Sequence, residues 1–173
     1  MFLTNHPATN HTQTIVQHIK NQESMLNIFK TKRKKITDDT LGTLTFKKSN
    51  RIDESYWNVD LKINSITELV EFYIYNNVDG INDKQKQLIL LIESKYPELI
   101  GSLQSFLNEQ IRKLDSDHSS ISIEKDLDIS FINIPQDPTE LNKWEINYIE
   151  KKGFTSYGIE IENWNPIDLG VSA

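Results

Sequence analysis

The chain has 173 residues, of which 37% are hydrophobic and 25% charged, and it contains no cysteine. This composition is that of one globular domain, and the missing thiols exclude disulfides, thiolate metal ligands and a cysteine nucleophile. No apolar run reaches the roughly 20 residues that a membrane-spanning helix needs. Because residues 1–22 also lack the order of a signal peptide, we expect a cytoplasmic protein without a membrane partner.

The charge is unevenly distributed along the chain. Residues 1–37 hold six basic side chains and one acidic side chain, a charge of +5, and the whole chain carries −6, which leaves −11 for residues 38–173. An acidic surface attracts basic partners and repels nucleic acid. We therefore divide the chain into an N-terminal arm with a basic helix, 1–37, and a single domain, 38–173.

The arm is expected to carry one amphipathic helix. Its apolar residues recur at helical spacing, and its end is a basic run between Lys30 and Lys35. Cations suit the C-terminal end of a helix dipole, so this run fits a solvated helix end. Two alternatives are a contact with nucleic acid or an acidic membrane, and packing of the arm on the protein's own acidic face.

Alternating apolar and polar residues next predict three strands, over 41–46, 56–63 and 69–75. In the second strand Trp57, Val59 and Ile63 share one face. The third strand has two mixed faces, so either Val70, Phe72 and Ile74 or the alternate residues point inward. Asp79-Gly80 then makes a turn.

The longest apolar pattern covers residues 82–114. Asn82 is a candidate N-cap with Gln85 three positions later. Apolar residues follow at helical spacing, interrupted by Pro97, whose ring disfavours helical geometry at Tyr96. We predict two helices or one sharply bent helix here, buried on most sides along the run 88–92.

Four further short strands are predicted after the helices, near 121–123, 127–131, 144–148 and 157–162. Strands in one run, then helices, then strands in a second run favour an α+β fold over βαβ winding. The expected architecture is a mostly antiparallel sheet of about seven strands in two runs, packed on a central helical pair, with an N-terminal helix.

Sequence motifs for catalysis or cofactor binding are not found. The glycines are scattered singly, with no phosphate-binding loop and no Gly-x-Ser-x-Gly elbow. The N-terminal histidines have no carboxylate partner at metal-ligand spacing. Asp115, Asp117 and His118 form an acid–imidazole cluster that lacks the glycine and the final glutamate of a calcium loop. We therefore expect no cofactor, no metal and no enzyme activity. The alternatives are an enzyme whose site is assembled from scattered carboxylates and His118, and a nucleic-acid-associated protein that uses Lys30–Lys35.

The last predicted strands present carboxylates opposite their apolar positions, with an aromatic residue close by. Such a surface suits a protein–protein interface, in which aromatic residues anchor and charges steer. An acidic solubilising face is the alternative interpretation. The candidate partner-binding residues are Asp126, Asp128, Glu145, Glu160, Glu162 and Trp164.

Short motifs in this order resemble a known class of bacterial domains. Leu41-Gly42-Thr43-Leu44, Tyr56-Trp57-Asn58-Val59 and the terminal strand from Tyr157 to Asn163 resemble small domains found beside polymorphic and contact-dependent inhibition toxins. Some of these are immunity proteins, each of which binds and blocks one cognate toxin domain. The resemblance covers roughly residues 38–173, implies no catalytic residues, and makes a basic toxin domain the expected partner.

Overall fold

The structure is a computed structural model that describes residues 33–51, 54–117, 119–138 and 143–172. The chain divides into two units, Met1–Arg33 and Lys34–Ala173. The helix expected in the N-terminal arm lies outside the described residues. All elements given below belong to the second unit.

One sheet of eight strands forms the framework, and its spatial order is the order of the sequence. All neighbouring strands are antiparallel except β4 and β5, which are parallel. The strands are β1 (Lys35–Asp38), β2 (Gly42–Lys47), β3 (Tyr56–Lys62), β4 (Leu69–Tyr75), β5 (Leu127–Ile134), β6 (Trp144–Glu150), β7 (Ser156–Glu162) and β8 (Asn165–Ser172).

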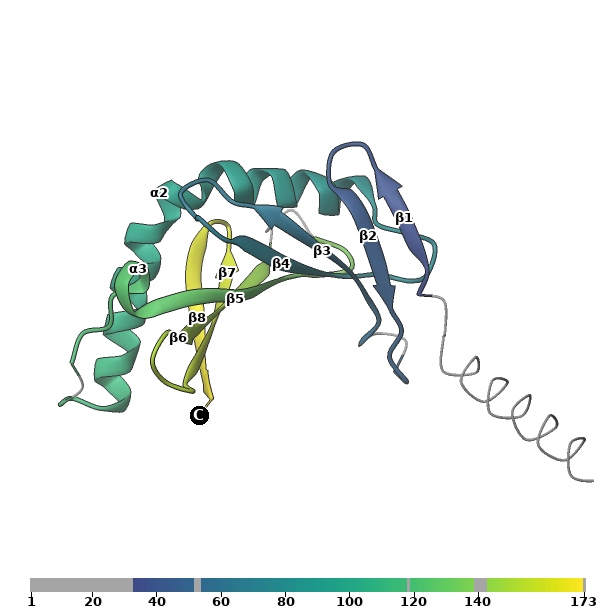
Figure 1. Ribbon diagram of the computed structural model, residues 1–173. Coiled ribbons are helices and arrows are strands. Elements are labelled where there is room, and N and C mark those ends of the chain that lie inside the picture. Colours follow the sequence, from purple (N-terminus) through teal and green to yellow (C-terminus); the bar gives the residue numbers. More distant parts are fainter. Residues whose placement is uncertain (1–32, 52–53, 118, 139–142, 173) are drawn as a thin grey trace, which may run out of the picture. The chain divides into compact units, whose positions relative to one another are not determined.

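The expected fold class was wrong in how the helices join the strands. The helical segment between β4 and β5 is a crossover connection, because a parallel pair of adjacent strands cannot be closed by a tight turn. The fold is therefore a single mixed sheet of eight strands rather than seven strands in two runs. It consists of two antiparallel meanders joined by one βαβ unit, with the helix over one face (Figure 1).

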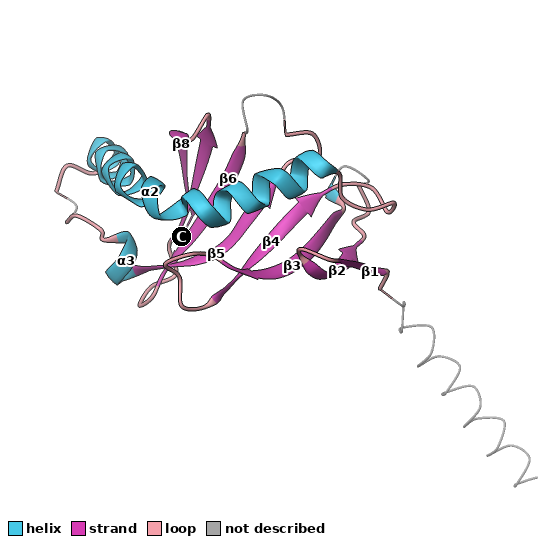
Figure 2. Ribbon diagram, turned by 90° about the horizontal axis from the view of Figure 1, so that it is seen from above, coloured by secondary structure: helices cyan, strands magenta, loops and turns pink. Residues whose placement is uncertain are grey.

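The crossover contains one long helix, α2 (Asp83–Leu114), so of the two predicted alternatives the helical pair is wrong and the single helix is observed. The predicted N-cap is confirmed: the Asn82 side chain accepts a hydrogen bond from the backbone N–H of Gln85 at 2.9 Å, and the Gln85 side chain accepts one from that of Asn82 at 3.1 Å. Pro97 lies inside the helix and does not end it. The axis of α2 turns along its length (Figure 2), as an interior proline makes it do.

The core lies between α2 and one face of the sheet. The buried positions of α2 recur three and four residues apart, and they include Leu88, Ile92, Leu99 and Leu103. Leu90 and Leu91 are exposed, so burial along this run is one-sided. On the sheet, the helix-facing residues include Trp57, Val59, Val70, Phe72, Ile74, Ile132, Ile146 and Ile159. The register of β4 left open by the sequence is thus settled in favour of Val70, Phe72 and Ile74.

Three elements differ from the sequence prediction. Residues 123–126 form a single helical turn, α3 (Ile123–Asp126), because the Ser122 side chain accepts the Lys125 N–H and Asp126 accepts that of Ser122. Residues 35–37, assigned to the arm, lie in edge strand β1. Edge strand β8 was missed, because Pro166 and a largely exposed pattern hide it.

Candidate functional site

The sheet has a second face, and no described helix covers it (Figure 1). We call it the open face. It is formed by side chains of β3 to β7 that alternate with the core residues, and most of them are half-buried against one another. They are Tyr56, Asn58, Glu71, Tyr73, Tyr75, Phe131, Asn133, Glu145, Asn147, Glu160 and Glu162.

Aromatic rings occupy the centre of the open face. Strand pairing places Tyr56 of β3 opposite Tyr75 of β4. The ring of Tyr56 lies 4.7 Å from that of Tyr73 and 5.9 Å from that of Tyr75, and Tyr73 stacks on Phe131 of β5 at 4.9 Å. Such contacts between cross-strand neighbours hold each ring in a fixed position. The cluster is therefore a rigid, half-exposed aromatic surface.

Carboxylates and amides surround these rings. Glu71 accepts hydrogen bonds from the Tyr73 hydroxyl at 2.9 Å and from the Asn58 amide. Burial, together with the bond to Glu71, raises the pKa of Tyr73 to about 12, and burial beside Glu145 also raises the pKa of Tyr75. Both phenols therefore stay neutral at physiological pH, and the negative charge of the face resides on its carboxylates.

Glu145 and Glu160 lie opposite each other on β6 and β7. Glu145 accepts a hydrogen bond from Asn133 Nδ2 at 2.6 Å, and Glu160 pairs with Lys143 at 2.8 Å. The bond to Glu160 raises the pKa of Lys143. Gly158 gives Glu145 room, because a Cβ at this position would lie 2.6 Å from Glu145 Oε1. A side chain at position 158 would therefore displace this carboxylate.

Two amide atoms of the open face have no partner within the described part of the chain. Asn133 Oδ1 and Asn147 Nδ2 are buried, and neither makes a hydrogen bond there. An unpaired buried polar atom costs about 1–3 kcal/mol. A shallow depression of about 450 Å³ includes Asn133 in its lining, together with Tyr75, Pro135, Asp137, Lys143, Trp144, Glu145 and Glu160.

The structure brings three of the six predicted residues onto this face. Glu145, Glu160 and Glu162 share it, on alternate positions of β6 and β7. Asp126 is exposed at the end of α3, and Asp128, at the start of β5, faces Lys151 at 3.6 Å. These two carboxylates lie away from the aromatic cluster.

Trp164 lies on the helix side of the sheet instead of beside Glu160. It sits in the two-residue turn between β7 and β8, where it and Asn163 have positive φ angles of 64° and 50°. Its ring contacts buried Trp144 at 6.0 Å and lies under the ammonium of Lys95, a residue of α2, at 4.8 Å. This side chain closes the end of the core.

Sequence reasoning missed the tyrosines of β3 and β4. The mixed faces of β4 hid them, because tyrosine can point either inward or outward from a half-buried strand. Once Val70, Phe72 and Ile74 are assigned to the core, Tyr73 and Tyr75 must point to the other face. The pairing of β3 with β4 then adds Tyr56.

The features behind the alternative functions give no second site within the described residues. No group of three or more histidine, aspartate or glutamate side chains there could hold a metal ion. His118 and Lys30 to Lys32 lie outside the described residues. Of the remaining basic run, Lys35 belongs to β1, and Lys34 Nζ donates to the Val78 carbonyl at 2.7 Å.

Comparisons of the chain with protein-family models, with curated proteins and with solved structures gave no match. Among the described helices, none has the length and apolar character needed to cross a bilayer.

Proposed function

We propose that this protein is a cytoplasmic binding protein rather than an enzyme, and specifically an immunity protein that neutralises a basic cognate toxin domain through the open face. The observation that carries the proposal is the aromatic cluster of Tyr56, Tyr73, Tyr75 and Phe131, ringed by carboxylates and uncovered by any described element. Fixed aromatic rings bind a partner with little loss of entropy.

The charge of the open face indicates the sign of the charge on its partner. Glu71, Glu145, Glu160 and Glu162 outnumber two described cations beside them, Lys143 and Lys47, the cross-strand partner of Tyr56. Opposite charges on two proteins raise the association rate, and correct pairing selects one partner. A protein that covers a toxin's active site can inhibit it by tight and specific binding alone.

The first experiment is capture from the source cell with the intact protein as bait, followed by mass spectrometry of the retained proteins. We expect one stoichiometric partner, a basic toxin domain, whose purified activity falls to background when one equivalent of this protein is added. A partner whose activity is unchanged would contradict the inhibitor role. The absence of any partner, in cells that express the neighbouring genes, would contradict the binding role.

Charge reversal then tests the face. We expect Glu145→Lys/Glu160→Lys to slow association with the captured partner at least tenfold at low salt, because both charges lie at the interface. The matched control, Glu98→Lys/Glu109→Lys, makes the same change of net charge on exposed residues of α2 and should slow association less than twofold. Equal effects of the two variants would show that only net charge matters and would exclude the open face.

A further inference from the structure

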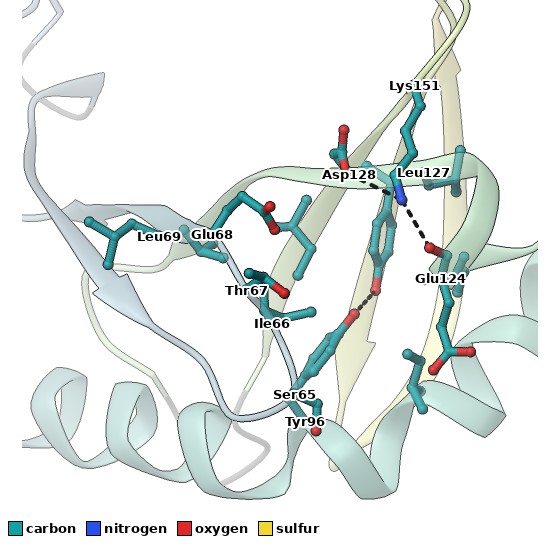
Figure 3. Close-up of a pocket in the computed structure, with 15 residues that line it drawn as sticks. Ser65, Ile66, Thr67, Glu68, Leu69, Tyr96, Glu124, Leu127, Asp128 and Lys151 are labelled. Carbon is teal, nitrogen blue, oxygen red and sulfur yellow. Dashed lines mark hydrogen bonds and ion pairs between the residues drawn. The ribbon is translucent and has the colours of Figure 1, made fainter.

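A cavity of about 580 Å³ lies on the helix side of the sheet (Figure 3). Its walls come from the turn between β3 and β4 (65–69), the middle of α2, α3 and the start of β5. Cavities that bind small molecules have volumes of roughly 300–1,000 Å³. No residue of the open face lines this cavity, so an inference about it does not depend on the proposed function.

Two tyrosines from different layers meet at the cavity. Tyr96 of α2 and Tyr148 of β6 are each 1% exposed, and their hydroxyl oxygens are 3.1 Å apart. Figure 3 shows the Tyr96 side chain, with a dashed line that marks its hydrogen bond. Burial raises the pKa of both hydroxyls, that of Tyr148 well above its ordinary value, so both keep their protons.

The two hydroxyls carry one hydrogen more than the hydrogen bond between them uses. Two neutral hydroxyls carry two hydrogens, and one hydrogen bond between them uses only one. Within the described residues neither hydroxyl has another hydrogen-bond partner. The second hydrogen therefore has no acceptor among the described residues, and a hydrogen left unpaired in a buried place costs about 1–3 kcal/mol. An oxygen atom of a bound molecule would remove this cost.

The remaining lining restricts the charge of such a molecule. Apolar side chains from all the walls line the cavity, among them Ile66, Ile100 and Leu127, together with the hydroxyl residues Ser65 and Thr67. The nearby cation, Lys151, already donates to the Glu124 carbonyl at 2.9 Å and faces Asp128 at 3.6 Å. Because carboxylates outnumber this one cation around the cavity, an anion would be repelled.

We propose that this cavity binds a small uncharged molecule with a mostly apolar body and one carbonyl oxygen, which accepts the spare hydroxyl hydrogen of the Tyr96–Tyr148 pair. The apolar walls hold the body of the ligand. The hydroxyl pair selects a ketone, ester or amide over a hydrocarbon of the same shape, because only the carbonyl completes the hydrogen bonding.

Acetophenone and ethylbenzene are suitable probes, because they share one skeleton and differ in the carbonyl oxygen. Binding of each to the full-length protein is measured by ligand-observed NMR titration, and the carbonyl stretch of bound acetophenone by infrared spectroscopy. We expect acetophenone to bind up to about tenfold more tightly, the equivalent of one net hydrogen bond. We also expect its carbonyl stretch to move to lower wavenumber.

The informative variant is the double substitution Tyr96→Phe/Tyr148→Phe. A single substitution leaves the other hydroxyl free to donate, whereas the double variant removes both donors and keeps both rings. We expect the double variant to lose the preference for acetophenone, because a carbonyl buried without a donor gains nothing over ethylbenzene, and to keep its affinity for ethylbenzene. Tyr157→Phe is the control, because the Tyr157 hydroxyl donates to Glu150 at 3.0 Å and does not line the cavity. It should keep the full preference for acetophenone.

Two results would overturn the proposal. One is a preference for acetophenone that persists in the double variant, since the oxygen would then be recognised by some other group. The other is a failure of both probes to bind the unaltered protein up to their solubility limits.

Discussion

Gln85 is a completely buried polar side chain that joins three segments of the chain. Its Nε2 donates to the carbonyls of Tyr75, at 2.9 Å, and of Pro135, at 2.8 Å. Its Oε1 accepts from the Asn82 N–H and from Asn76 Nδ2. The ends of the parallel strands β4 and β5 are thereby tied to the beginning of α2, at the point where the crossover starts.

We therefore expect Gln85→Ala to lower the free energy of unfolding by about 2–4 kcal/mol, because it leaves several buried groups unpaired and removes half of the capping box. Gln87→Ala is the matched control: this residue is exposed on the same helical turn, and its loss should cost less than about 0.5 kcal/mol. Urea denaturation measures both values. Similar losses in the two variants would show that Gln85 has no special role.

Asp38 joins edge strand β1 to α2 through an ion pair. Its Oδ2 lies 2.5 Å from Lys86 Nζ, and its Oδ1 accepts from the N–H groups of Thr40 and Leu41. The hydrogen bond from Lys86, followed by that from Leu41, holds the pKa of Asp38 below its usual 3.8. The same hydrogen bond to Asp38 raises the pKa of Lys86 above 10.5.

This pair gives stability a defined pH dependence. The contribution of Asp38 is present above pH 3.8 and is lost as the pH falls through the lowered pKa of the folded state. That of Lys86 is present below pH 10.5 and is lost as the pH rises through its raised pKa. We expect Asp38→Asn to cost up to about 1 kcal/mol at neutral pH. The difference from the unaltered protein should shrink below about pH 4. Urea denaturation from pH 7 to pH 3 measures it, and a constant difference would contradict the ion pair.

At the scale of elements, α2 and β6 are connected by the Tyr96–Tyr148 hydrogen bond. Tyr96 directly precedes Pro97, so this contact lies where the helix axis is expected to bend. Removing one hydroxyl leaves the other buried without a protein partner, whereas removing both leaves nothing unpaired.

We therefore expect Tyr96→Phe and Tyr148→Phe each to lower the free energy of unfolding by about 1 kcal/mol, and the double variant to cost no more than either single one. The double-mutant cycle is measured by urea denaturation without any ligand. Strictly additive losses would show that the two hydroxyls do not interact.

Sequence patterns found the elements that carry strong local signals. The Asn82 cap and the three-four spacing of apolar residues located α2, and the alternation of apolar and polar residues located β3, β6 and β7. Pro97 left open whether one bent helix or two would form, and the helical pair of the expected architecture was wrong. Packing of buried Tyr96 and Leu99 outweighs the local cost of a proline in a helix. Edge strands β1 and β8 bury one face incompletely, so their sequences show little alternation.

The parallel pairing of β4 with β5 could not be predicted, because it depends on which strands meet after a crossover of about fifty residues. Part of the candidate site also depends on which strands pair, and that part could not be predicted either. Glu145, Glu160 and Glu162 were found by alternation within single strands, while the tyrosine and phenylalanine cluster arises from pairing across β3, β4 and β5. Trp164 was placed on the wrong side because the turn it occupies reverses the chain.

At the scale of the whole molecule, residues 34–173 form a compact unit with its own core. Four basic residues and one acidic residue give residues 1–33 a charge of +3, which leaves −9 for this unit. The open face consists entirely of residues after position 55. Folding and partner recognition should therefore both reside in this unit.

We expect a fragment of residues 34–173 to unfold cooperatively in urea and to bind the captured partner with the affinity of the full chain. A fragment of residues 39–173 lacks β1, including Ile36, which packs on the core, and Asp38, which pairs with Lys86. It also leaves β2 as an unprotected edge. The shorter fragment should lose about 2–3 kcal/mol of stability. Equal stability of the two fragments would show that β1 is dispensable, and loss of binding in the longer one would show that residues 1–33 contribute to recognition.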